Sequence, residues 1–405
     1  MTTWHIITGE YPPAPGGVSD YTEAVAAGLA AAGDSVHVWC PAAPGPLPSH
    51  PRVEVHAIAG SWRAGDFDRL DAALDAIAGQ KQLLVQWVPH AYGRRSLNLG
   101  FCRWIRRRAG AGDRVDLMVH EPCFAFREGS LKQDAAAAVH RVMLALLLSR
   151  ARRVWMSIPG WAERLAPWTF GRKGVEFCWL PVPSTIPVAS SNGALSRLRS
   201  DALARQDGVI LGHFSTYPPE IRDALLAVLP GLLASLPETQ VELLGRGSEA
   251  MAGALRSVAA VDPARIRAAG DLSAASLSCH LQACDLLIQP YPDGASTRRT
   301  TLMAALSHGI PVVTTIGHLS ERFWQDSSAI AAVPSGDVAA MAAVVGELVR
   351  QPERRRRLGA TGRSAYDERF SLPRVIDALR ADALIAGTWC AVIPGGSRSK
   401  RFANT

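Results

Sequence analysis

The sequence predicts an α/β fold with two parallel sheets. Short apolar runs alternate with longer amphipathic segments along the 405-residue chain, the pattern of strands and helices that follow one another in turn. A turn-rich stretch from Pro181 to Gly193 breaks both periodicities, and the alternation restarts after it. The chain is long enough for two hydrophobic cores. We therefore predict two Rossmann-like domains that face each other across a cleft.

Before the turn-rich stretch, apolar runs predict strands and amphipathic segments predict helices. The strands are expected at 4–7, 35–39, 53–58, 83–86, 116–120 and 154–157, and the helices at 21–32, 67–77, 97–108 and 134–150. These elements predict an N-terminal Rossmann-like domain over 1–185 and a linker over 186–207.

The second half repeats the pattern and closes with helices. Strands are expected at 209–212, 241–244, 266–268, 285–289 and 311–314, and the closing helices at 339–350, 353–368 and 374–386. We predict a second Rossmann-like domain over 208–370, a C-terminal helix within 371–390, and a disordered tail over 391–405.

The composition is that of a globular protein of the cytoplasm. Hydrophobic residues make up 48% of the chain and charged residues 20%, which disfavours a disordered chain. No apolar run reaches the roughly 18 residues of a membrane span, and the first residues lack the pattern of a signal peptide. None of the seven cysteines forms a CxxC pair. We expect reduced thiols rather than a disulfide framework or a zinc site.

The net charge of +7 favours an anionic partner without choosing which one. Nucleic acid is not expected, because no basic stripe is interleaved with aromatic residues. The segment 101–108 places Phe101, Trp104 and Ile105 on one helical face and arginines on others. That pattern fits either a helix packed on its sheet or peripheral contact with an anionic membrane. The oligomeric state is left open.

A glycine-rich loop lies between the first expected strand and the first expected helix. Gly16 and Gly17 permit close approach of the backbone to a ligand, and the amides that open the next helix point toward it. An ordinary glycine turn, with Ser19 or Asp20 as the helix N-cap, has the same pattern.

A second polar loop follows the strand expected at 285–289. Arg298 and Arg299 stand at its junction with a helix, beside Thr300 and Thr301. Guanidinium groups, hydroxyls and a helix N-terminus together make a phosphate site. The Gly/Ser/Thr-rich loop at the carboxyl end of a strand favours this site over a solvated arginine pair.

These segments, in this order and spacing, make the chain resemble family 4 of the retaining glycosyltransferases, which have the two-domain GT-B fold. The resemblance covers roughly 4–370. It rests on Tyr11-Pro-Pro-Ala-Pro-Gly-Gly-Val-Ser-Asp-Tyr, on Val119-His-Glu-Pro, and on Ala283-Cys-Asp-Leu-Leu-Ile-Gln-Pro through Leu306-Ser-His-Gly-Ile-Pro-Val-Val.

The resemblance implies sugar transfer, with retention, from a nucleoside-diphosphate sugar to an acceptor hydroxyl. The first domain would bind the acceptor, which is a small molecule, a glycan or a lipid-linked compound, and the second would bind the donor. The closing helix would cross back onto the first domain.

The resemblance also implies a set of site residues. Gly16, Gly17, Gly212, His213, Arg298, Arg299, Thr300 and Thr301 would contact the donor, mainly its diphosphate. His120 would face the donor sugar and the acceptor, with Glu121 as a further sugar or acceptor contact. His120 and Arg298 are the expected catalytic residues.

Three positions depart from the family pattern. Members have two glutamates in an E-x7-E arrangement, and alignment on His308-Gly-Ile-Pro places Ser296 and Ala304 there. The arginine that follows the glycine of the second domain's first strand is His213. We expect Ser296 to contact sugar or acceptor, and Arg298 and Arg299 to supply the missing positive charge.

The mechanism implied by the family needs no cofactor and no metal. Arginines and helix N-termini stabilise the charge that develops on the departing nucleoside diphosphate. The leaving phosphate oxygen then accepts the proton of the acceptor hydroxyl. Asp66-Phe-Asp68 matches a metal-binding Asp-x-Asp pattern, but it opens an expected helix, where acids serve as caps.

Two alternative functions stay open. Gly245, Gly247 and Ala250 fit the GxGxxA turn of an NAD(P)-dependent oxidoreductase, although Asp262 is too near to be the usual acidic partner. The absent glutamates also allow a non-catalytic protein of the same fold that only binds a nucleotide or a sugar.

Overall fold

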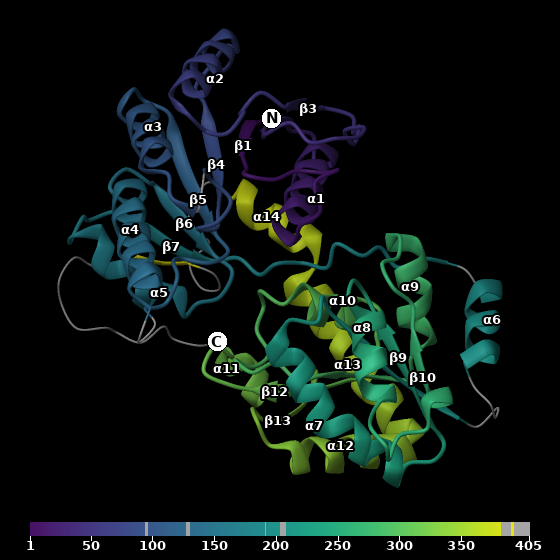
Figure 1. Cartoon of the computed structure of the whole chain (residues 1–405). Helices are drawn as coiled ribbons and strands as arrows, with labels where there is room; N and C mark the ends of the chain where they lie inside the picture. Colours follow the sequence, from purple (N-terminus) through teal and green to yellow (C-terminus); the bar gives the residue numbers. More distant parts are fainter. Residues whose placement is uncertain (94–95, 127–129, 191, 203–207, 382–389, 393–405) are drawn as a thin grey trace. The chain divides into compact units, whose positions relative to one another are not determined.

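A computed structural model describes residues 1–93, 96–126, 130–190, 192–202, 208–381 and 390–392 (Figure 1). The chain divides into two compact units, one formed by Met1–Pro181 with Leu372–Thr405 and the other by Val182–Ser371. Each unit is a parallel sheet with helices on its faces, so the fold class is the predicted pair of Rossmann-like domains.

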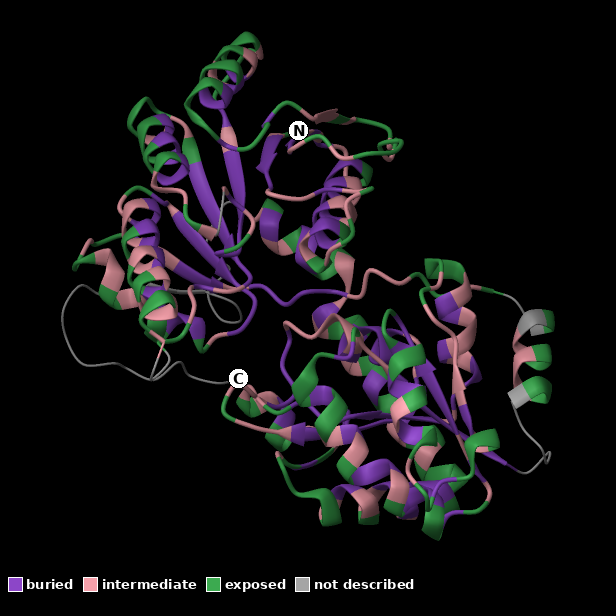
Figure 2. Cartoon of the chain, viewed as in Figure 1, coloured by how far each residue is buried: buried purple, intermediate pink, exposed green. Residues whose placement is uncertain are grey.

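The sheet of the first unit has the order β14-β7-β6-β5-β4-β1-β2-β3. Its strands are β1 (Thr3–Ile7), β2 (Ser35–Trp39), β3 (Val53–His56), β4 (Gln82–Trp87), β5 (Arg114–Val119), β6 (Arg153–Met156), β7 (Glu176–Trp179) and β14 (Cys390–Val392). All pairings are parallel except that of β14 with β7. The central strands are apolar and buried along their length (Figure 2) because helices cover both faces.

The helices of this unit are α1 (Gly17–Ala31), α2 (Ala64–Ala76), α3 (Leu99–Gly110), α4 (Leu131–Leu148), α5 (Trp161–Leu165), the 3-10 turn η2 (Ala166–Thr169) and α14 (Leu372–Arg380). The apolar face of α3 is buried: Trp104 stacks on Phe67 of α2, and Phe101 stacks on Tyr92. The helical face of Phe101, Trp104 and Ile105, for which the sequence left a membrane contact open, is therefore part of the hydrophobic core. Among the helices that the structure describes, none is long and apolar enough to cross a bilayer.

Helix α14 packs on α1, far from it in sequence. Gly28 of α1 leaves room for Ile376, since a Cβ at position 28 would lie 2.8 Å from the Ile376 Cδ1 atom. Arg380 Nε donates to the buried Asp34 carboxylate at 2.9 Å, which also accepts from Trp4 Nε1 at 3.2 Å. The last described helix thus closes the first unit.

The sheet of the second unit has the order β10-β9-β8-β11-β12-β13 and is parallel throughout. Its strands are β8 (Val209–Phe214), β9 (Thr239–Leu244), β10 (Ile266–Ala268), β11 (Leu286–Gln289), β12 (Val312–Ile316) and β13 (Ala331–Pro334). Its helices are α6 (Asn192–Ala202), α7 (Pro219–Ser235), α8 (Ser248–Arg256), α9 (Ala274–Ala283), α10 (Thr300–Ser307), α11 (Arg322–Asp326), α12 (Val338–Arg350) and α13 (Pro352–Ala365), with turns η3 (Pro263–Arg265) and η4 (Tyr366–Phe370).

The predicted strands and helices of both halves are present, with ends shifted by a few residues, and β7, β13 and β14 are additional. The stretch 186–207, expected as a linker, contains α6, which packs on α9. The expected disordered tail over 391–405 is wrong at residues 391 and 392, which belong to β14, and its remainder, 393–405, lies outside the described residues. The expectation of reduced thiols is wrong for Cys178, which is disulfide-bonded. The antiparallel register of β14 on β7, which nothing in the sequence signals, sets Cys390 opposite Cys178.

Candidate functional site

Each sheet has one point at which neighbouring strands lead the chain in opposite directions. In the second unit this point lies between β8 and β11, because the chain runs from β8 to β9 and β10 on one side and from β11 to β12 and β13 on the other. In the first unit it lies between β1 and β4. Ligands of open parallel sheets bind at such points, outside the carboxyl ends of the strands.

The loop that follows β11 carries the two arginines predicted to hold phosphate. Arg298 Nη2 and Arg299 Nη2 both donate to the carboxylate of Asp293, one to each oxygen. Burial favours the neutral carboxyl, but the two guanidinium groups hold the pKa of Asp293 below its ordinary value. The cluster therefore carries two positive charges and one negative charge, and its excess is positive. Side-chain exposures of 18% for Arg298 and 26% for Arg299 leave both within reach of a ligand.

Helix α10 begins directly after these arginines. Arg299 is its N-cap, and the Arg299 side chain makes no capping hydrogen bond to the helix. The guanidinium carbon of Arg299 lies 4.7 Å from the ring centre of Tyr291, whose hydroxyl is 2.7 Å from Thr301 Oγ1. The structure thus brings Arg298, Arg299, Thr300 and Thr301 together at a helix N-terminus, where phosphate is bound in many proteins.

Glu321, which the sequence analysis did not single out, holds this loop in place by hydrogen bonds. Its carboxylate accepts from the backbone N–H of Thr297 at 2.8 Å, from the Thr297 hydroxyl, and from Trp324 Nε1 at 2.7 Å. Burial raises the pKa of Glu321 to about 7, against these hydrogen bonds, which lower it. Ser296, the neighbouring residue, is fully buried, and its hydroxyl has no hydrogen-bond partner among the described residues.

Gly212 and His213 have structural roles at the end of β8. A Cβ at position 212 would lie 2.5 Å from Cys284 Sγ and from Leu287 Cδ2, so packing requires a glycine here. His213 is fully buried, and its Nδ1–H donates to the Ile288 carbonyl at 2.7 Å. Burial lowers the pKa of His213 to about 4, and the imidazole is neutral at pH 7. Its Nε2 atom has no partner among the described residues.

In the first unit, the loop after β1 brings an acid to the N-terminus of α1. A Glu10 carboxylate oxygen accepts from the backbone N–H of Ser19 at 3.1 Å. A Cβ at position 16 would lie 2.3 Å from the same Glu10 oxygen, whereas a Cβ at position 17 would meet nothing within 4 Å. The backbone is therefore accessible at Gly17, whereas the Ser19 amide, one of those expected to face a ligand, donates to Glu10 instead.

His120 follows β5 and is almost completely buried. Its Nε2–H donates to Gln86 Oε1 at 2.8 Å, and the ring of Tyr21 contacts it edge-on with centroids 4.8 Å apart. Burial lowers the pKa of His120 to about 3. The imidazole is therefore neutral, with its remaining lone pair on Nδ1. Glu121 beside it is half-buried.

A cavity of about 920 Å³ opens on the first unit, at the carboxyl ends of β2, β3 and β4. Three arginines and three aromatic residues contribute to its wall: Arg63, Arg103, Arg107, Trp62, Phe67 and Trp104. The wall combines positive charge with aromatic surface, a combination suited to an anionic molecule with an apolar part or a sugar ring.

The Asp66-Phe-Asp68 segment opens α2, as the capping interpretation requires. The Asp66 carboxylate accepts from the backbone N–H groups of Arg63 at 2.9 Å and Ser61 at 3.0 Å, and it pairs with Arg69. These hydrogen bonds, the one from Arg63 foremost, lower the pKa of Asp66 against a smaller effect of burial.

Two family models match the chain, one in each unit. The model described as "Glycosyl transferase 4-like domain" matches residues 16–181, and the one described as "Glycosyl transferases group 1" matches residues 206–351. Phosphatidyl-myo-inositol mannosyltransferase of Mycobacterium leprae is 25% identical over 367 residues, which are 87% of this chain and 88% of that protein.

Solved structures agree on the fold. Sucrose-phosphate synthase of Thermosynechococcus elongatus superposes with a TM-score of 0.70 at 16% identity, over 94% of this chain and 97% of that one. HepE of Anabaena, in complex with UDP and glucose, gives 0.64 at 13% identity, over 94% and 98%. Together with the family models, these matches establish the two-domain GT-B architecture. The chain belongs to the glycosyltransferase 4-like enzymes of this fold, which transfer a sugar from a nucleotide-sugar donor.

Proposed function

We propose that the chain transfers a hexose, with retention, from a nucleoside-diphosphate sugar to a hydroxyl of an anionic acceptor. The observation that carries the proposal is the N-terminus of α10, which its own N-cap side chain does not cap, beside Arg298 and Arg299. Negative charge grows on the diphosphate as the glycosidic bond breaks, and fixed positive groups at that position lower the barrier. The family resemblance also implies a donor contact from the backbone of the Gly16–Gly17 loop, which stays a prediction.

No protein carboxylate is needed as the base in this proposal. The leaving phosphate oxygen accepts the proton of the acceptor hydroxyl, as is usual for retaining transferases of this fold. His120 is neutral and anchored to Gln86, so its Nδ1 accepts a hydrogen bond from a sugar hydroxyl and does not act as an acid. Ser296 stands where the resemblance places a family glutamate, and its buried hydroxyl, which has no hydrogen-bond partner among the described residues, would replace it.

The donor site is tested by thermal shift of the whole chain against UDP, GDP, ADP, TDP, NAD and NADP. A ligand that binds only the folded protein raises its melting temperature. We expect one nucleoside diphosphate to do so, and Arg298→Ala to weaken its binding roughly 10- to 100-fold, the value of one hydrogen bond to a charged group. The matched control is Arg322→Ala, which removes an exposed arginine of the same unit.

Other outcomes of this screen would overturn the proposal. Stabilisation by NAD or NADP alone would favour the oxidoreductase, and equal binding by Arg298→Ala and the control would remove the α10 site. Binding of a nucleoside diphosphate without turnover of any sugar derivative would leave the non-catalytic relative.

For the acceptor, we propose a lipid-linked molecule whose phosphate is recognised by the cavity of the first unit. The arginines and aromatic residues of that cavity support this class, as does the phosphatidyl-myo-inositol named for the Mycobacterium leprae relative. Arg103 is exposed in the cavity wall. We expect Arg103→Ala to raise the KM for phosphatidylinositol about tenfold, with the affinity for the nucleoside diphosphate unchanged.

Arg106 supplies the control for the acceptor experiment. It is exposed on the same helix but does not line the cavity, so Arg106→Ala should leave the KM unchanged. An equal effect of both substitutions would mean that the charge of the helix, and not the cavity, attracts the acceptor.

A further inference from the structure

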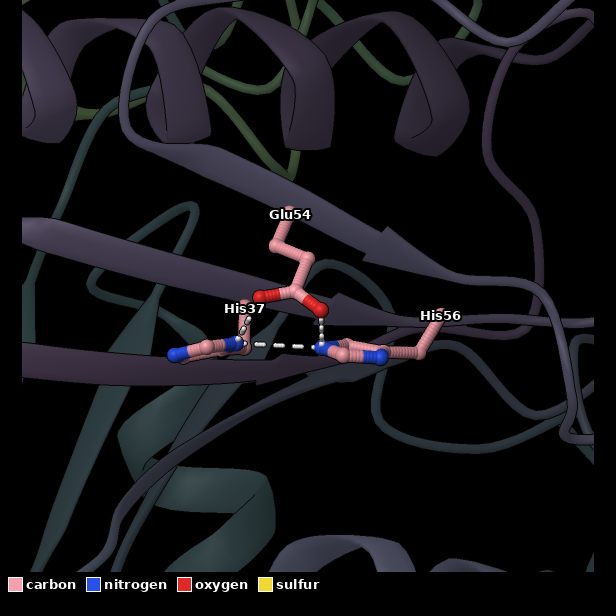
Figure 3. A group of neighbouring side chains, drawn as sticks. All are labelled: His37, Glu54 and His56. Atoms are coloured by element: carbon pink, nitrogen blue, oxygen red, sulfur yellow. Dashed lines mark hydrogen bonds and ion pairs between the residues drawn. The ribbon is translucent and has the colours of Figure 1, made fainter. Parts of the chain in front are cut away.

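Three side chains with metal-binding atoms converge on one face of the first sheet, at its β3 edge (Figure 3). His37 comes from β2, and Glu54 and His56 come from β3. The parallel register sets His37 opposite Glu54 and Trp39 opposite His56. Residues two apart on a strand share a face, so all three side chains lie on the same side of the sheet.

The spacing of their ligand atoms is that of a metal site. His37 Nδ1 and His56 Nε2 are 3.0 Å apart, and the Glu54 carboxylate oxygens lie 3.5 Å from the first and 3.7 Å from the second. A tetrahedral zinc ion with ligands about 2.0–2.2 Å away sets its ligand atoms roughly 3.3–3.5 Å apart. Within the described part of the chain, this is the one group of three such side chains whose ligand atoms all lie within 4.8 Å of one another.

Aromatic neighbours hold the two imidazoles in place. The His56 ring stacks on Trp39 with centroids 4.0 Å apart, and the His37 ring stacks on His5 at 5.1 Å. Trp39 Nε1 donates to His5 Nδ1 at 3.3 Å, which fixes the stack as a whole. Ligand rings locked in this way lose little freedom when an ion binds.

The side chains are of the types that bind a cation. A neutral imidazole nitrogen and a carboxylate oxygen are the forms that bind metal. His37 and His56 are 12% and 18% exposed, whereas Glu54 is 67% exposed, so an ion here has a route from solvent.

We propose that His37, Glu54 and His56 bind one zinc ion, which links the edge strand β3 to β2 and leaves its fourth position to water. The ion would replace the proton that the two imidazole nitrogens now share. This site is independent of sugar transfer, since the proposed donor and acceptor sites use other residues.

The test is titration of the EDTA-stripped full-length chain with zinc chloride, followed by calorimetry and, with cobalt chloride, by visible absorption. We expect one tight equivalent, a cobalt spectrum of tetrahedral type, and a rise in melting temperature with zinc. Removing a ligand should weaken binding by at least about tenfold, the lower end of the cost of losing a residue that merely orients one. Glu54→Gln is the main variant, because an exposed side chain can be replaced without loss of the fold.

The control is His50→Gln. His50 Nε2 contacts Glu23 at 3.0 Å, a histidine–carboxylate pair with no third ligand among the residues that the structure describes. Zinc binding should be unchanged in this variant. Two results would overturn the proposal: absence of a tight equivalent in the parent chain, or retention of that equivalent in Glu54→Gln and in the double variant His37→Gln/His56→Gln. The three residues would then be only a hydrogen-bonded cluster.

Discussion

His213 and His120 are buried imidazoles, each anchored by one nitrogen. His213 donates to a backbone carbonyl and His120 to the Gln86 side chain, so each has a fixed tautomer and no opposite charge. Burial lowers the pKa of His213 to about 4 and that of His120 to about 3. At the residue scale, neutral imidazoles therefore stand at both positions, one where the family resemblance led us to expect an arginine and one expected to be catalytic.

These low pKa values predict acid sensitivity. The unfolded chain binds a proton at His213 near pH 6.5, whereas the folded chain binds it only near pH 4. Between these values the unfolded state holds more protons, so the free energy of unfolding falls as pH falls, by roughly 3 kcal/mol from this residue. We expect His213→Asn, which can still donate to the Ile288 carbonyl, to flatten the pH dependence of the melting temperature over that range.

The matched control is His50→Asn, because the His50 side chain is 31% exposed whereas His213 is fully buried. Thermal unfolding is followed from pH 4 to pH 7 in all three proteins. A slope in His213→Asn equal to that of the parent chain would mean that His213 is not the group that titrates.

At the scale of elements, the two helix N-termini expected to receive the donor differ. Two arginines precede that of α10, and the side chain of its N-cap, Arg299, makes no capping hydrogen bond. That of α1 has the Glu10 carboxylate on the Ser19 amide. A diphosphate at α1 would meet a negative charge, which weakens the attraction of the helix end for an anion.

This arrangement predicts that Glu10 opposes donor binding. We expect Glu10→Gln to tighten the binding of the preferred nucleoside diphosphate about twofold to fivefold, the usual worth of one charge at a helix end. Titration calorimetry measures the change. Glu23→Gln is the control, since Glu23 is a half-buried acid later in the same helix, paired with His50. Unchanged affinity in Glu10→Gln would place the diphosphate away from α1.

The elements themselves follow from the sequence, because buried parallel strands are continuous apolar runs and their helices are amphipathic. The junction at Arg298 to Thr301 was also predictable, since it depends on residues adjacent in the chain. The Asp293 and Glu321 contacts that hold it were not, because they depend on the path of the loop. The same holds for His37, Glu54 and His56, which come together only through the register of β2 and β3.

At the scale of the whole molecule, the first unit is discontinuous in sequence. Its sheet is complete only with segments that follow the second unit, and α14 covers α1 through Val375, Ile376 and Leu379, all buried. The second unit, in contrast, is the single segment Val182–Ser371. The stability of the first unit should therefore depend on the end of the chain, and that of the second should not.

We expect a chain that ends at Ser371 to lose stability in the first unit alone. The truncation removes the burial of three aliphatic side chains, worth about 1.5–3 kcal/mol each, a large part of the 5–15 kcal/mol that stabilises a typical domain. Arg380 would also be lost from Asp34. Ile376→Asp should act in the same direction by placing a charge against Gly28, and Arg374→Ala, at an exposed position of α14, should not. Scanning calorimetry should show one transition at a lower temperature and another at an unchanged temperature. Binding of a nucleoside diphosphate by the second unit should be retained. If both transitions fall together, α14 stabilises the whole molecule and the two units do not unfold independently.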